Sequence, residues 1–60
     1  MNKYNIYDIQ SGKWLAGRAT FKGATHRAQK LANMTGTKKL VTHRDQRYEV
    51  NPNRGFEKTA

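Results

Sequence analysis

The stretch from residue 4 to residue 21 constrains the fold of this chain most strongly, because it predicts two strands joined by a tight turn. Two runs, YNIYDI and WLAGRATF, alternate with a period near two and are rich in aromatic and β-branched residues. Between them, QSGK supplies turn chemistry, since Gly12 takes a positive φ at no steric cost. We therefore expect a β-hairpin around which the other elements are arranged.

Two loop lengths fit this hairpin, and both give the same two faces. A two-residue loop sets Ile9 opposite Trp14, whereas a four-residue loop ending at Gly12 sets Tyr7 opposite Trp14. The mostly apolar face, which suits a helix, consists of Tyr4, Ile6, Leu15, Gly17, Ala19 and Phe21. The mixed face consists of Asn5, Tyr7, Ile9, Trp14, Ala16, Arg18 and Thr20. A three-residue loop would exchange the faces of the first strand, and this alternative stays open.

A helix is predicted from about Lys22 to Met34, because alanine, glutamine, lysine, arginine and leucine favour helix. Thr20 or Thr25 is the expected N-cap, and Gly36 is the expected left-handed residue after the helix. A narrow apolar stripe is formed by Ala24, Ala28, Leu31 and Met34 or Thr35. A stripe made mostly of alanine predicts close approach of the helix to the sheet.

Two further strands follow, over Thr37–His43 and Arg47–Val50, with a turn at residues 44–46 between them. Because Pro52 cannot join a central ladder, we expect one domain over residues 1–50 and a flexible tail over residues 51–60 that is dispensable for folding. The predicted class is α+β, in the order β-β-α-β(-β), with one helix packed on one face of a three- to four-stranded antiparallel or mixed sheet. The predicted core is Tyr4, Ile6, Leu15, Ala19, Phe21, Ala28, Leu31, Leu40 or Val41, and Tyr48.

Charge is the strongest global property of the chain. Twelve Lys and Arg residues oppose four Asp and Glu residues, which gives a net charge of +8 in 60 residues. Such an imbalance attracts polyanions, and nucleic acid is the usual polyanion for a small basic domain. No cysteine, signal peptide or membrane-spanning apolar run is present, so we expect a cytoplasmic protein without a membrane partner.

The residues that carry catalysis or metal binding do not form a recognisable constellation. The carboxylates and imidazoles are Asp8, Asp45, Glu49, Glu57, His26 and His43, and their spacing matches neither an acid–base pair nor a metal site. Gly12, Gly17 and Gly23 are too far apart to form a phosphate-binding loop. The sequence predicts no enzyme, no metal and no cofactor.

Basic residues interleaved with aromatic residues favour binding of DNA or RNA, with cations on phosphates and rings stacked on bases. The predicted nucleic-acid-binding residues are Tyr7, Lys13, Trp14, Arg18, Lys22, Arg27, Lys30, Lys38, Lys39 and Arg44. The structural alternative is that Tyr7 and Trp14 form a cross-strand pair that only stiffens the hairpin, and that the lysines are solvated surface.

A second functional hypothesis is a protein-binding accessory, a regulator or inhibitor of a larger enzyme, with Tyr7, Ile9 and Trp14 as its hot spot. The short lysine- and asparagine-rich sequence resembles in style the small accessory proteins of bacteriophages, a likeness that rests on no motif. In either case we expect a monomer or a weak dimer.

Overall fold

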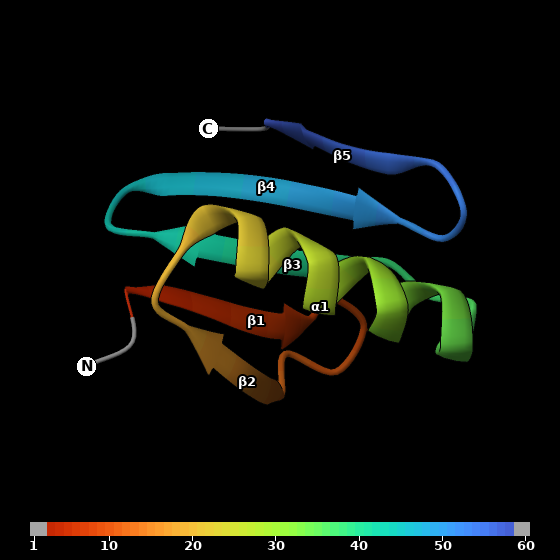
Figure 1. Cartoon of the computed structure of the whole chain (residues 1–60). Helices are drawn as coiled ribbons and strands as arrows, with labels where there is room; N and C mark the ends of the chain where they lie inside the picture. Colours follow the sequence, from red (N-terminus) through yellow and green to blue (C-terminus); the bar gives the residue numbers. More distant parts are fainter. Residues whose placement is uncertain (1–2, 59–60) are drawn as a thin grey trace.

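The computed structural model describes residues 3–58 as one helix packed on a five-stranded antiparallel sheet. Along the chain, the elements are β1 (Tyr4–Asp8), β2 (Trp14–Arg18), α1 (Phe21–Thr35), β3 (Lys39–His43), β4 (Gln46–Asn51) and β5 (Gly55–Lys58). The strand order is β2-β1-β3-β4-β5, and α1 lies over the middle of the sheet (Figure 1). The predicted α+β class is confirmed. The mixed-sheet alternative is wrong, because β3 pairs antiparallel to β1.

The first hairpin has the four-residue loop, and Tyr7 is paired with Trp14. The loop closes where the Asp8 amide donates to the Lys13 carbonyl at 2.9 Å and the Gly12 amide donates to the Asp8 carbonyl at 2.7 Å. Gly12 has a φ of 74°, a left-handed conformation that glycine adopts without strain. This turn chemistry was readable in the sequence.

A β-bulge in β2 places the residues that follow it on the opposite sides of the sheet from those predicted. Ile6 pairs with Ala16 while Tyr7 pairs with Trp14, so Leu15 is an extra residue on β2. Both Leu15 and Ala16 pack against the core. Arg18 consequently pairs with Tyr4 and lies on the helix side of the sheet, not beside Trp14 as predicted.

The helix has the predicted caps and packs through small residues. The Thr20 hydroxyl accepts from the Gly23 amide at 3.1 Å, and Gly36, at a φ of 73°, donates its amide to Ala32. The fully buried apolar residues are Ile6, Val41 and Val50 on the sheet and Ala24, Ala28 and Ala32 on the helix. Two predicted apolar positions are wrong: Ala19 is exposed, and Met34 is 72% exposed.

Aromatic rings fill the space at the beginning of the helix, where the alanine stripe would leave a gap. Phe21 lies at the centre, with ring centroids 5.9 Å from Tyr4, 5.0 Å from Tyr48 and 5.2 Å from Phe56. The angles between the ring planes are 63°, 64° and 81°, which is the favourable edge-to-face geometry. Tyr4 also stacks on His43 at 4.3 Å.

The fifth strand was not predicted, because the tail was expected to be flexible. Phe56 pairs with Val50 across β4 and β5. Two polar side chains of α1 hold the connecting loop: Gln29 donates to the Asn51 carbonyl at 2.8 Å, and Asn33 accepts from the Asn53 amide at 2.6 Å. The segment therefore extends the sheet despite Pro52.

We expect Phe56→Ala to lower the free energy of unfolding by about 1–2 kcal/mol, since half of a phenylalanine burial and its ring contacts are lost. Phe56 is 48% exposed, so the full value for a buried ring does not apply. Urea unfolding followed by circular dichroism measures the change, with Arg54→Ala, an exposed residue of the same segment, as the control. If both variants match the parent, β5 does not contribute to stability.

Candidate nucleic-acid interface

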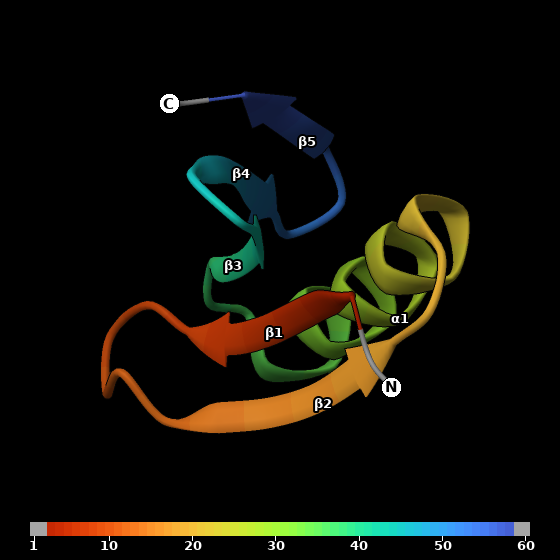
Figure 2. The same ribbon diagram turned by 90° about the vertical axis from the view of Figure 1, so that its left-hand side faces the viewer.

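One face of the sheet is covered by α1, and no helix or strand of the described chain covers the other, here called the open face (Figure 2). The pairing register places Trp14, Tyr7, Leu40 and Glu49 in one row across four neighbouring strands. Beside it runs a second row that consists of Gly17, Asn5, Thr42 and Arg47. The open face thus presents an apolar row next to a polar row.

Trp14 is held in a defined orientation on this face. Its indole Nε1 donates to the side-chain carbonyl of Asn5 at 3.1 Å, and Asn5 pairs with Gly17, which has no side chain to displace the ring. Trp14 remains 51% exposed. A ring that is fixed yet exposed loses little conformational entropy when a ligand stacks on it.

Arginines border the aromatic row. A groove on the open face is lined by Tyr7, Leu40, Thr42, Arg44 and Arg47, together with residues of the first turn. Arg44 is exposed and occupies the β3–β4 turn with a φ of 59°, a left-handed conformation that is uncommon for arginine. The groove therefore combines apolar walls with guanidinium groups, which suit planar or anionic ligands.

Lys38 is also near this face, but part of its charge is already balanced. Its ammonium lies 3.6 Å from the Glu49 carboxylate, and its side chain is 57% exposed. An exposed pair of this kind contributes little to stability and leaves the lysine accessible. Lys38 is therefore a contributor at the border of the open face.

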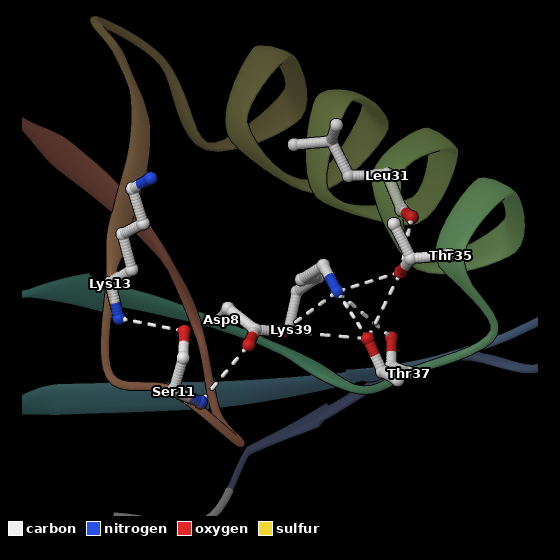
Figure 3. A network of polar contacts seen from close by, with 7 residues as sticks. All are labelled: Asp8, Ser11, Lys13, Leu31, Thr35, Thr37 and Lys39. Carbon is white, nitrogen blue, oxygen red and sulfur yellow. Dashed lines mark hydrogen bonds and ion pairs between the residues drawn. The ribbon is translucent and has the colours of Figure 1, made fainter.

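Lys39 was predicted to bind nucleic acid, but it is buried with 2% exposure and is the centre of a polar network (Figure 3). Its ammonium lies 2.9 Å from the Asp8 carboxylate and 2.8 Å from the Thr35 hydroxyl, and it also donates to Thr37. All three donor hydrogens are used within the protein. Lys39 connects the first turn, the end of α1 and β3, and cannot reach a ligand.

Asp8 stabilises the same network from the turn. Its carboxylate accepts from Lys39 and from the Ser11 amide, the latter at 3.0 Å. These hydrogen bonds, first that of Lys39 and then those of Ser11, lower the pKa of Asp8 from 3.8 to about 2. The network fixes the turn that precedes Trp14, and Asp8 also lines the groove of the open face.

The remaining predicted residues lie away from the open face. Lys13 shares a groove with Leu15 and Leu31 on the helix side, and Lys22, Arg27 and Lys30 belong to α1. Arg18 is likewise on the helix side of the sheet. The predicted set thus divides between the two sides of the sheet. Tyr7, Trp14, Lys38 and Arg44 remain together on or beside the open face.

Sequence reasoning missed Leu40 and Arg47 as members of this surface. Arg47 was not among the predicted binding residues, and Leu40 was left interchangeable with Val41 because both are apolar. The buried Val41 settles this point, since its neighbour Leu40 must then face the other way.

Among the side chains that the structure describes, no cluster of three or more His, Asp or Glu residues is arranged to hold a metal ion. No helix of the described part of the chain is long and apolar enough to cross a membrane. Comparison with protein-family models, curated proteins and solved structures finds no match to this chain.

Proposed function

We propose that this protein is a small, non-enzymatic nucleic-acid-binding protein and that the open face is its binding surface. The observation that carries the proposal is the position of Trp14 and Tyr7 side by side on a face that α1 leaves uncovered. A buried aromatic pair would only stabilise the fold, whereas Trp14 is half exposed. Nucleobases are suitable partners for such rings because every base has a π-face.

The charge of the protein supports the same ligand. A net charge of +8 attracts any polyanion, and Arg44 and Arg47 place guanidinium groups beside the aromatic row. Arginine binds phosphate oxygens through two parallel N–H donors. The aromatic rings can stack on the base of a nucleotide, and the neighbouring guanidinium groups can bind its phosphate.

The backbone at Arg44 gives an independent argument. A non-glycine residue at a φ of 59° is strained, and asparagine or glycine would fill this turn position more easily. Backbone strain of this kind clusters at ligand-binding and other functional sites. We therefore assign Arg44 a role in ligand binding rather than in folding.

We expect Arg44→Asn to leave the free energy of unfolding unchanged or raised by up to about 1 kcal/mol, because asparagine tolerates the left-handed conformation. The same change should weaken nucleic-acid binding and flatten the dependence of log K on log salt by about 0.7–0.9, the value for one phosphate contact. Fluorescence anisotropy with a labelled oligonucleotide measures the affinity and its dependence on salt.

Lys30→Asn is the matched control, since it removes one exposed cation from α1. It should keep the parent's salt slope. Equal slopes for all three proteins would show that Arg44 does not contact phosphate. A flatter slope for the Lys30 variant alone would move the binding surface to α1.

The second candidate function, a protein-binding accessory, uses the same surface. Ile9 is 41% exposed and adjoins Tyr7 in the groove, so Ile9, Tyr7 and Trp14 would form an aromatic and aliphatic hot spot. A pull-down from lysate with and without nuclease separates the two functions. Protein capture that survives nuclease and depends on Trp14 would favour the accessory.

A further inference from the structure

We infer that the open face takes a single strand rather than a duplex, with neighbouring bases stacked on Trp14 and Tyr7. This inference rests on the proposed function and specifies its ligand. The two rings belong to directly paired residues on adjacent antiparallel strands. Strands in a sheet are about 4.8 Å apart, so the two positions are close enough for successive bases of one chain.

A duplex cannot use these rings in the same way. In a double helix both faces of each base are covered by its neighbours, and a flat aromatic residue finds no free π-face. Groove and phosphate contacts would use Arg44 and Arg47 but would leave the exposed indole of Trp14 without a partner. Stacking on an unpaired base uses the rings and the cations together.

The rows of the open face also limit the length of the site. Leu40 continues the apolar row after Tyr7, but the next position is Glu49, an acid that disfavours phosphate. The apolar row therefore spans three strands, about 10 Å. The phosphates are expected over the neighbouring row, toward Arg47 and the turn that contains Arg44. A site of this length accommodates about four nucleotides, which is the lower end of the site sizes of single-strand-binding folds.

The competing surface is α1, whose sequence contains no acidic residue. Lys22, His26 and Lys30 are all exposed on it and could contact the phosphates of a duplex. The rings on or beside this surface are His26 and Phe56 of β5, so it has no tryptophan or tyrosine that could stack on a base. The experiment must therefore separate binding that depends on rings from binding that depends on charge alone.

The fluorescence of Trp14, the single tryptophan of the chain, reports directly on the site. The full chain is titrated with oligothymidine and oligouridine from dinucleotide to dodecanucleotide, and with a blunt duplex, at about 0.05 M and 0.2 M salt. We expect single strands to quench the fluorescence. The affinity should rise with strand length up to about four nucleotides. Beyond this length it should increase only in proportion to the number of positions at which the strand can bind. The duplex should bind at least about 10-fold more weakly and leave the fluorescence unchanged. The thymidine and uridine series distinguish DNA from RNA.

Variants provide the second measurement, by anisotropy of labelled oligothymidine. Trp14→Ala should weaken binding about 5- to 150-fold without changing the salt slope. Tyr7→Ala should weaken it in the same range, and Tyr7→Phe, which keeps the ring, should restore it. The matched control is Met34→Ala, which removes an apolar side chain that is 72% exposed on α1. It should bind like the parent.

The outcomes separate this inference from the proposed function. Equal affinity for duplex and single strand, with unchanged fluorescence and no effect of Trp14→Ala, would overturn the inference. Nucleic-acid binding would then depend on cations alone, and the salt slopes of Arg44→Asn and Lys30→Asn would show whether the open face or α1 carries it. If no oligonucleotide binds at about 0.05 M salt, the proposed function fails as well.

Discussion

An Ile6→Ala variant is expected to be largely unfolded at 25 °C. Ile6 is fully buried in the middle of β1, between the alanine stripe of α1 and the neighbouring Val41. Truncation of a buried isoleucine costs about 2–5 kcal/mol, and a domain of this size seldom has more than about 3–5 kcal/mol in total. One side chain therefore accounts for most of the available stability.

The chain offers a matched control in Ile9, an isoleucine just after the same strand that is 41% exposed. Ile9→Ala should change the free energy of unfolding by no more than about 0.5 kcal/mol. Far-UV circular dichroism with urea titration measures both variants. Similar urea midpoints for the Ile6 and Ile9 variants would show that the core is not centred on β1.

The second large effect is expected in the buried polar network. Lys39→Ala removes a long buried side chain and should cost about 2–5 kcal/mol, as for other buried side chains of this length. Asp8→Ala should also destabilise strongly, because it leaves the buried Lys39 ammonium without its counter-ion. The double variant Asp8→Asn/Lys39→Met removes both charges at similar volume, and should be more stable than Asp8→Ala. A double variant less stable than Asp8→Ala would contradict this account.

The network also predicts how stability depends on pH. The folded-state pKa of Asp8 is about 2, below the 3.8 of an unperturbed carboxyl, so its contribution is complete above pH 3.8 and is lost as the pH falls toward 2. In Asp8→Asn this acid-sensitive part of the stability should be absent. Thermal melts between pH 5 and pH 2 test this at about half-unit steps. The matched substitution is Asp45→Asn, which removes an exposed carboxylate of the β3–β4 turn outside the Lys39 network.

The helix caps and the first turn, which depend on the chemistry of single residues, were predictable from the sequence. Thr20 and Gly36 cap α1 as expected, and Gly12 ends the first loop as expected. In each case one residue type satisfies a backbone requirement that few others satisfy. Tyr48 was likewise predicted in the core, and it packs against the core from β4.

The bulge at Leu15 could not be read in the same way. Leu15 and Ala16 are both apolar, so the run WLAG fits a regular strand and a bulged strand equally well. The choice depends on packing under α1, which is tertiary information. The error moved Arg18 to the wrong side of the sheet and overstated the charge beside Trp14.

The different environments of Lys38 and Lys39 show a second limit of prediction from the sequence. The two residues are adjacent and chemically identical, yet Lys38 is exposed beside Glu49 and Lys39 is buried beside Asp8. A buried lysine is rare, and its partners come from a turn and a helix end that are distant in sequence. The fifth strand was missed for a similar reason, since Gln29 and Asn33 hold its loop from α1.

The bulge in β2, rather than the composition of the strand, decides on which side of the sheet Arg18 lies. Deletion of Leu15 would keep the pairs Ile6–Ala16 and Tyr4–Arg18 and leave Arg18 on the helix side, whereas a regular strand of unchanged length would turn Arg18 toward Trp14. Removal of the bulge at constant length would thereby transfer a guanidinium group from the helix side to the open face while every side chain kept its identity. The gain or loss of a bulge in β2 is thus a route by which related chains could exchange charge between the two sides of the sheet.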